Sequence, residues 1–192
     1  PDPVMDEYQI AKTVSPVCGG LTARAEFEGL TGLSGTFYPQ GTIEYLVLWG
    51  GKAKPRYSLA QEFKKQGYST CAIHQNARNY YNRSSVYESM GFETYIAEDT
   101  YGEDVAEEYK NQDSFLTNAH FLKLLKEQLE QDEKAPKFIW GITIESHMPY
   151  TNKYSDLEIH ASYEGMTPAS QLELDNYIQS VKRTDEFVGE LI

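Results

Sequence analysis

A helix pattern runs directly into a strand pattern over residues 57–73, which read YSLAQEFKKQGYSTCAI. Ser58 can cap the start of the helix, and Gly67 can end it. Residues 68–73 then have the composition that favours a strand. A helix, a glycine and a strand in this order are half of the repeat of a parallel α/β sheet, so this stretch predicts that fold class.

Similar patterns recur along the chain. Residues 137–144 read KFIWGITI, a nearly all-apolar run without alternation, which is typical of a strand buried on both faces of a parallel sheet. Gly91 ends a short helix pattern, and another strand pattern follows it. We therefore predict one open, mostly parallel sheet with strands at 68–73, 92–97 and 137–144 and with helices on both faces at 57–66, 84–90, 113–131 and 168–190.

Finer predictions concern the segments between these elements. The apolar residues 43–49 favour a short strand, and the acidic residues 98–110 favour one or two exposed helical turns. Asp113 or Ser114 can cap the 113–131 helix. The residues expected to face the core are Phe115, Ala119, Leu122, Leu125 and Leu129 on that helix and Leu172, Tyr177, Val181, Phe187 and Val188 on the last helix.

The composition is that of one globular domain with an acidic surface. The chain has 192 residues, of which 40% are hydrophobic and 13% aromatic, enough for one good core. The formal charge of −12, without a run of lysine or arginine, argues against binding to nucleic acid or to anionic membranes. The 15 tyrosines indicate a wet cleft with aromatic walls, as in proteins that bind polar ligands or sugars. No apolar run has the length of a membrane span, and no signal peptide is visible.

A Gly-Gly turn leads into a helix within residues 15–32, which read SPVCGGLTARAEFEGLTG. Thr22 opens this helix, where its side chain can cap free backbone N–H groups, and Gly32 ends it. The positive end of the helix dipole and the free donors there suit a phosphate group. A turn followed by an ordinary capped helix is the alternative interpretation.

Polar loops leave the carboxyl ends of two predicted strands. His74 follows the 68–73 strand in a loop that ends at Arg83, and His147 lies in the loop after the 137–144 strand. Ligands of open α/β sheets bind beyond such strand ends, so we expect these three residues to converge with the 15–32 helix on one phosphate-sized ligand. Each residue also has an alternative interpretation without a ligand. His74 could be hydrogen-bonded within its loop, His147 could order the turn before Pro149, and Arg83 could be a surface charge.

Three motifs together resemble a known family. They are SPVCGGLTARAEFEGLTG at 15–32, HQNARNYYNR at 74–83 and IESHMPYT at 144–151. In this order and at this approximate spacing they resemble the extracellular domain of lipoteichoic acid synthases and related phosphoglycerol transferases, of the alkaline phosphatase and sulfatase superfamily. The resemblance covers most of residues 15–190 and implies an alkaline phosphatase/sulfatase-like fold.

The resemblance also implies roles for individual residues. Thr22 is then the nucleophile and also contacts a catalytic divalent metal ion, usually Mn²⁺, with Mg²⁺ as an alternative. Tyr81 falls where relatives often carry tryptophan, and Asn76 matches a loop position that is often acidic or an amide in relatives. The substrate-binding residues implied in this way are His74, Arg83, His147, Tyr81 and Asn76.

The chain departs from the family pattern at both ends. Relatives carry a metal-binding glutamate before the threonine motif and an Asp-His pair after the last helix, and both are missing here. We therefore expect residues 1–192 to be one partial catalytic domain, truncated at both ends, which does not turn over by itself. Glu26 and Glu28 are interpreted as helix-face residues rather than as the missing ligand.

The cysteines do not indicate sulfatase chemistry. Sulfatases use a modified cysteine in a Cys-x-Pro-x-Arg context, whereas Cys18 is followed by Gly-Gly-Leu-Thr and is interpreted as a buried loop residue. Cys18 and Cys71 form neither a disulfide framework nor the paired spacing of a zinc site. His120 and His160 are assigned structural roles.

The function implied by the resemblance is phosphoglycerol transfer. The threonine takes glycerophosphate from a phosphatidylglycerol-type lipid and passes it to a glycerophosphate polymer or a glycolipid. The reaction takes place at the extracellular face of a bacterial membrane, with transmembrane anchors outside this chain. Two alternatives stay open: a phosphodiesterase or sulfatase-type hydrolase, in which water resolves the intermediate, and a non-catalytic module that binds phosphate or a polyol.

Overall fold

A computed structural model describes residues 21–49, 57–101, 105–131 and 135–191 of the chain. At its centre lies a three-stranded sheet in the order β2-β1-β3, in which both strand pairs are parallel. The strands are β1 (Ser69–His74), β2 (Thr94–Ile96) and β3 (Lys137–Ile142). The predicted α/β class and the parallel sheet are confirmed.

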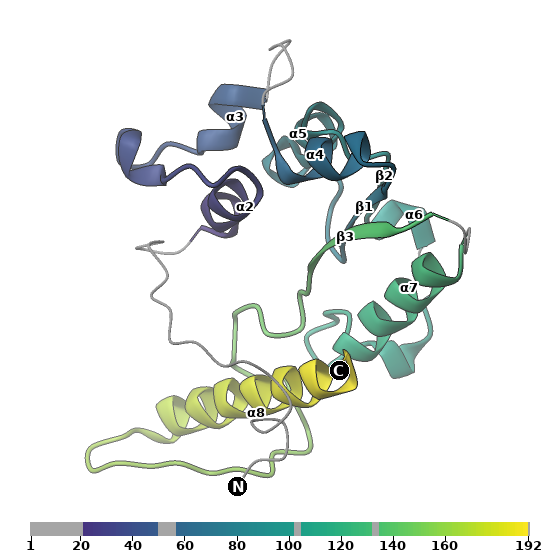
Figure 1. Ribbon diagram of the computed structural model, residues 1–192. Coiled ribbons are helices and arrows are strands. Elements are labelled where there is room, and N and C mark those ends of the chain that lie inside the picture. The colour runs from purple at the N-terminus through teal and green to yellow at the C-terminus, as the bar shows by residue number, and fades with distance from the viewer. Residues whose placement is uncertain (1–20, 50–56, 102–104, 132–134, 192) are drawn as a thin grey trace, which may run out of the picture.

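Helices and short helical turns surround the sheet (Figure 1). The α-helices are α2 (Thr22–Thr31), α3 (Glu44–Trp49), α4 (Leu59–Lys65), α5 (Arg83–Met90), α6 (Glu98–Tyr101), α7 (Asn118–Glu130) and α8 (Pro168–Leu191). The 3₁₀ turns are η1 (Gly35–Phe37), η2 (Tyr80–Asn82) and η3 (Glu107–Tyr109). The turns α6 and η3 agree with the prediction for the acidic residues 98–110.

The hydrophobic interior consists of two cores, one on each face of the sheet, and successive side chains of β1 pack into them alternately. Ala72 packs with α2, α3, α4 and α5, in a core that includes Phe27 and Val86. Cys71 and Ile73 pack on the other face of the sheet, in a core with α7 and α8. Because side chains alternate along a strand, one strand serves both cores. Helices therefore cover both faces, as predicted (Figure 1).

Several predicted helix boundaries are confirmed. Gly32 and Gly91 end α2 and α5 in the left-handed conformation, with φ of 70° and 96°. Ser58 caps α4, because its hydroxyl accepts a hydrogen bond of 3.2 Å from the backbone N–H of Gln61.

The prediction of a strand at residues 43–49 is wrong, because this segment forms α3. Arg24 of α2 anchors it, since its Nε donates a 2.7 Å hydrogen bond to Oε1 of the fully buried Glu44. Tyr45 is fully buried beside them, whereas Val47 is 64% exposed. Periodicity cannot separate helix from strand over such a short apolar run, and here the ion pair to α2 favours the helix.

The helix predicted at 113–131 begins later, and its predicted buried face is correct at Leu122 and Leu125 but wrong at Ala119 and Leu129. It is capped by Thr117 rather than by Asp113 or Ser114, and the backbone N–H of Asn118 donates to Glu145 at 2.6 Å. The predicted face was counted from Phe115, which lies outside the helix, so Ala119 and Leu129 are exposed. The buried residues of α7 are Asn118, His120, Phe121, Leu122 and Leu124, and Leu125 is partly buried against them.

The face predicted for the last helix is also largely wrong. Phe187 is buried, as predicted. The other four expected core residues are exposed: Leu172, Tyr177, Val181 and Val188. The buried face of α8 is polar because it holds the preceding loop through side-chain-to-backbone hydrogen bonds. Asn176 Oδ1 accepts from the backbone N–H groups of Lys153 and Tyr154, both at 2.9 Å.

Cys71 is a buried free thiol, and burial raises its pKa to about 12. Such a thiol is unreactive at neutral pH. Cys18 lies outside the described residues, so the interpretation of it as a buried loop residue stays a prediction. Within the described ranges, no helix combines the length and the apolar character needed to cross a bilayer.

Candidate active site

The sheet topology creates a crevice beyond the carboxyl ends of β1 and β3. The two strands are neighbours, with His74 opposite Ile142 at these ends. The chain leaves β1 toward α5 on one face and leaves β3 toward α8 on the other. Such a divergence is where open α/β sheets bind ligands.

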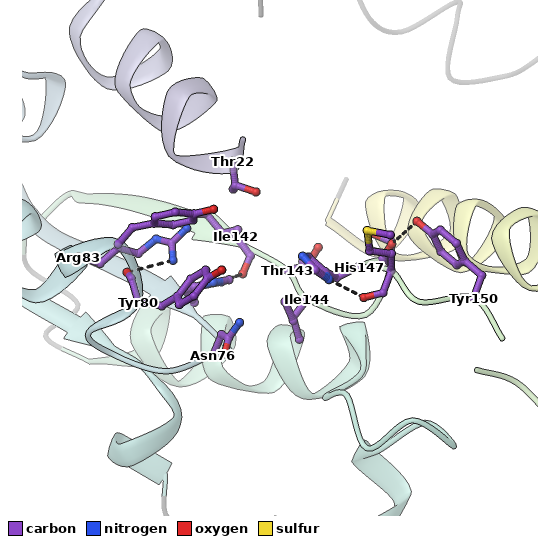
Figure 2. Close-up of a pocket in the computed structure, with 13 residues that line it drawn as sticks. Thr22, Asn76, Tyr80, Arg83, Ile142, Thr143, Ile144, His147 and Tyr150 are labelled. Carbon is purple, nitrogen blue, oxygen red and sulfur yellow. Dashed lines mark hydrogen bonds between the residues drawn. The ribbon is translucent and has the colours of Figure 1, made fainter. Parts of the chain in front are cut away.

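A cavity of about 480 Å³ occupies this crevice (Figure 2). The six residues that the sequence singled out lie in its wall: Thr22, His74, Asn76, Tyr81, Arg83 and His147. The other lining residues are Tyr80, Ile142, Thr143, Ile144, Ser146, Met148 and Tyr150. Residues from three separate segments of the chain, at Thr22, 74–83 and 142–150, therefore share one cavity.

Thr22 is the first residue of α2. Its side chain does not cap the helix, although the sequence suggested that it could. Leu21 stands at the cap position with φ of 71°, and its carbonyl accepts hydrogen bonds from the N–H groups of Arg24 and Ala25. Within the described ranges, nothing hydrogen-bonds to the Thr22 hydroxyl. The exposed hydroxyl thus lies at the positive end of a helix, at the edge of the cavity (Figure 2).

His74 is buried at the end of β1 and is held as a neutral base. Its Nδ1 lies 3.1 Å from the carbonyl oxygen of Ile142, which can only accept, so Nδ1 carries the proton and Nε2 keeps a lone pair. Burial lowers the pKa of His74 to about 4, and the nearby charge of Arg83 adds to this effect. His74 can therefore accept a hydrogen bond from a ligand hydroxyl at neutral pH.

Arg83 is not a surface charge but part of a buried ion pair with Glu26. Its Nη2 and Nε donate to the Glu26 carboxylate at 2.6 and 3.2 Å, and the two side chains are 1% and 2% exposed. Tyr87 donates a further hydrogen bond of 2.6 Å to Glu26. Burial alone would lower the pKa of Arg83, but the hydrogen bonds and charge of Glu26 outweigh it and raise that pKa.

This network corrects the interpretation of Glu26 as a plain helix-face residue. Glu26 orients the guanidinium from one side, and Nη1 of Arg83 donates to the Tyr80 carbonyl at 3.4 Å. An arginine has five N–H donors, so one remains on each terminal nitrogen for a ligand in the cavity. The pair fixes a bidentate phosphate-type donor in place.

Tyr81 lies over Arg83 in a strained backbone conformation. The guanidinium carbon is 5.3 Å from the centroid of the Tyr81 ring. Tyr81 and Asn82 have φ of 56° and 55°, a left-handed conformation that is uncommon for residues other than glycine. Local strain of this kind is held by surrounding contacts and clusters at functional sites. The ring of Tyr80 packs against that of Tyr81, with centroids 4.4 Å apart.

His147, from the loop after β3, and Asn76, from the loop between β1 and α5, complete the wall. Nδ1 of His147 donates to the Met148 carbonyl at 2.6 Å, so Nε2 of this exposed side chain remains available. Oδ1 of Asn76 accepts from the N–H of Ala77 at 2.7 Å, which leaves its amide NH₂ group for other partners. Tyr150 closes the His147 loop by donating to the Ser146 carbonyl at 2.8 Å.

Sequence reasoning missed Tyr80 and Tyr150 in the wall and Glu26 behind it. The high tyrosine content was the signal for the first two, but it does not point to positions. The partnership of Glu26 with Arg83 links residues 57 positions apart, which no local pattern reveals.

The described part of the site does not by itself fit a divalent metal ion. Among residues 21–49, 57–101, 105–131 and 135–191, no group of three or more histidine, cysteine, aspartate or glutamate side chains lies close enough together to hold one. Glu26, the acidic residue nearest to the arginine, is already committed to its ion pair.

Two curated relatives cover much or all of the chain. A protein of Rhizobium meliloti named for cyclic β-1,2-glucan modification is 33% identical over 100% of this chain and 29% of its own length. A lipoteichoic acid synthase of Staphylococcus saprophyticus is 26% identical over 67% of this chain and 19% of its own length. The chain thus spans less than a third of the length of these relatives.

Solved structures share the fold at low sequence identity. The phosphoglycerol transferase GacH of Streptococcus pyogenes, in complex with sn-glycerol-1-phosphate, has a TM-score of 0.66 and 24% identity over 90% of this chain and 45% of that one. The lipoteichoic acid synthase LtaP of Listeria monocytogenes has a TM-score of 0.62 and 20% identity over 88% and 40%. The periplasmic domain of EptC from Escherichia coli, in complex with Zn, has a TM-score of 0.53 and 16% identity over 89% and 45%.

The family model that matches this chain extends well beyond the cavity. It covers residues 10–192 and bears the description sulfatase. That match and the 33% identity to the Rhizobium meliloti relative over the full chain show that this protein belongs to the sulfatase family.

Proposed function

We propose that the protein transfers glycerophosphate from a phosphatidylglycerol-type lipid to a polymer hydroxyl, through a covalent intermediate on Thr22. One observation carries the proposal: the Thr22 hydroxyl, which has no hydrogen-bond partner within the described residues, shares its cavity with the fixed guanidinium of Arg83 and with two histidines. The solved relative that holds sn-glycerol-1-phosphate has the same fold.

The first step forms a bond between the Thr22 oxygen and the phosphorus of the lipid. The bond between phosphorus and the diacylglycerol oxygen breaks, and its electron pair stays with that oxygen. The proton of the Thr22 hydroxyl passes to the leaving diacylglycerol through Nε2 of His147, which is exposed and free to exchange it. In the second step the oxygen of an acceptor hydroxyl bonds to phosphorus, the bond between phosphorus and the Thr22 oxygen breaks, and the proton of the acceptor hydroxyl passes through Nε2 of His147 to the Thr22 oxygen.

The remaining residues hold the glycerophosphate. The two spare N–H groups of Arg83 bind phosphoryl oxygens, where negative charge develops in the transition state. Nε2 of His74 accepts a hydrogen bond from a glycerol hydroxyl, and the amide NH₂ of Asn76 donates to another. The Tyr81 ring keeps the guanidinium in place from the side of the cavity.

A divalent metal ion, Mn²⁺ or Mg²⁺, belongs to the proposal through the family resemblance. Thr22 is the described residue that would contact it, and its other ligands would lie outside the described residues. Such an ion lowers the pKa of a bound hydroxyl and neutralises charge on a phosphodiester.

The acceptor is a polyhydroxylated polymer at the outer face of a bacterial membrane. The staphylococcal relative supports a glycerophosphate polymer or a glycolipid. The Rhizobium meliloti relative, which is more similar and matches the whole chain, supports a glucan as a second candidate. Anchoring to the membrane would come from segments outside this chain.

The test uses phosphatidylglycerol labelled in its headgroup, incubated with the full-length protein and Mn²⁺. We expect a mass increase of one glycerophosphate on the peptide that contains Thr22, and release of diacylglycerol. Thr22→Ala should abolish both, whereas Thr22→Ser should retain some labelling and Thr94→Ala, at an exposed threonine of β2, should behave as wild type. Equal turnover by wild type and Thr22→Ala would refute the proposal.

A further inference from the structure

A second cavity, of about 800 Å³, adjoins the site cavity, and of its described lining residues Asn76 alone takes part in the proposed holding of glycerophosphate. Asn76 and Ile144 line both cavities, so these residues form a shared wall. The other residues around the second cavity are Gln75, Glu98, Asp99, Tyr101, Val105, Lys110, Ser114, Phe115 and Leu116. Its size is that of a pocket for a ligand larger than glycerol phosphate.

Gln75 lines this cavity and has an unused hydrogen-bond acceptor. It is 4% exposed, and its amide NH₂ group donates to the Thr117 carbonyl and to Nδ1 of His120, both at 3.1 Å. These two acceptors fix which end of the amide is nitrogen, and Oε1 is left buried without a partner among the described residues. A buried amide oxygen of this kind favours a ligand that supplies a hydroxyl donor.

Tyr101 brings a second unused polar atom. Its hydroxyl is buried and has no hydrogen-bond partner in the part of the chain that the structure describes. Its ring packs edge-on against His120, with centroids 4.9 Å apart, so the histidine that orients Gln75 also supports Tyr101. A hydroxyl can donate and accept at once, which matches this pair of groups and the chemistry of a sugar.

The charges around the cavity disfavour an anionic ligand. Of the charged lining residues, Glu98 and Asp99 are acidic, and Lys110 is paired with Glu107 at 2.8 Å. Asp99 is paired with Arg78 at 2.7 Å, so among the described lining residues Glu98 is the charge without an ion-pair partner. Phe115 and Leu116 add apolar surface against which the carbon face of a sugar ring can pack.

The cavity also lies in the right direction for an acceptor. Figure 2 shows Thr22 on one side of the site cavity and Asn76 and Ile144 on the other. In phosphoryl transfer the attacking and leaving oxygens lie roughly in line, so a hydroxyl that displaces Thr22 from phosphorus must approach from the side opposite Thr22. The shared wall is on that side.

We propose that the second cavity binds a neutral sugar unit of the acceptor and presents its hydroxyl to the phosphorus bound to Thr22. This inference rests on the proposed transfer function and names its acceptor class as an uncharged, polyhydroxylated chain. Gln75 and Tyr101 recognise the sugar hydroxyls, and Glu98 opposes an anionic glycerophosphate chain.

Binding measurements with chemically defined probes test the inference. We expect a neutral β-linked gluco-oligosaccharide to bind the protein in an NMR titration, and to remain bound when sn-glycerol phosphate is added, because the two occupy different cavities. Tyr101→Phe should lower the binding affinity for the oligosaccharide by about fivefold, which is the effect of losing one hydrogen bond. Tyr109→Phe is the matched control, since this ring also contacts His120, at 5.3 Å between centroids, but does not line the cavity.

A glycerophosphate oligomer of equal length should bind more weakly than the neutral sugar. Glu98→Gln should reduce the difference between these two binding affinities, because it removes a negative charge from the cavity. The inference is wrong if the sugar does not bind, if Tyr101→Phe and Tyr109→Phe weaken it equally, or if glycerol phosphate displaces it. Labelling of Thr22 by phosphatidylglycerol is measured separately without any acceptor. Failure of that labelling refutes the transfer function, whereas successful labelling with an unchanged sugar affinity in Tyr101→Phe refutes the acceptor site alone.

Discussion

The two sides of the site cavity are built in different ways. The side formed by α2 and α5 is part of the core: Glu26, Arg83 and Tyr87 are each at most 2% exposed, and Arg83 and Tyr87 both donate hydrogen bonds to Glu26. The other side is formed by residues 146–150 of the loop after β3, where Met148 is 66% exposed and the hydrogen bonds of His147 and Tyr150 are local. The phosphate-type donor is therefore fixed before a ligand arrives, whereas the loop can change without disturbing the core.

The largest effect is expected from Glu26→Ala, which breaks the core side. The substitution leaves the Arg83 charge buried without its partner, and loss of one member of a buried ion pair costs about 3–5 kcal/mol of the free energy of unfolding. Urea unfolding measures the change. Glu88→Ala, at an exposed position of α5, is the control and should change stability by less than about 0.5 kcal/mol. Equal effects from the two substitutions would show that the ion pair does not stabilise the fold.

The pH dependence of stability tests the burial of His74. Its pKa is about 4 in the folded protein, against about 6.5 in an unfolded chain. Between these values the unfolded chain binds a proton that the folded protein does not, so this contribution to stability is full above about pH 6.5 and falls as the pH decreases toward 4. The loss from this one group approaches about 3 kcal/mol. His74→Gln, compared by urea unfolding across this pH range, should show a shallower decrease; parallel curves would contradict the prediction.

His147→Ala sharpens the contrast from the loop side. Because the side chain is exposed and its bond is local, the free energy of unfolding should change by less than about 0.5 kcal/mol. Transfer of glycerophosphate should nevertheless slow by about a hundredfold, the lower range for loss of a general acid–base group. A loss of stability comparable to that of Glu26→Ala would place the loop in the core as well.

The sequence contained most of what was needed to predict the sheet. Residues 68–73 have a strand-favouring composition and residues 137–144 are a nearly all-apolar run; β3 lies within the second range, and β1 starts within the first and extends one residue beyond it, to His74. The positions of His74 and His147 followed from those strand ends. Local patterns of this kind report on local structure, and the parallel sheet is a simple consequence of helices between strands.

The parts that sequence reasoning could not predict depend on contacts between distant residues. The strand expected at 43–49 is a helix because Glu44 pairs with Arg24, which lies in another element. The last helix turns polar residues inward because Asn176 bonds to the backbone of a loop more than 20 residues away. In both places a specific tertiary hydrogen bond overrides the apolar periodicity.

Thr22 and Glu26 stand four positions apart on α2, and side chains at this spacing lie on the same face of a helix. One helix thus carries both the proposed nucleophile and the carboxylate that forms the ion pair with Arg83. A tilt or slide of α2 would move the two together, which preserves their mutual alignment. Insertion of a single residue between them would instead rotate one by about 100° relative to the other. The spacing of four residues therefore sets the orientation of the proposed nucleophile relative to the carboxylate that holds Arg83.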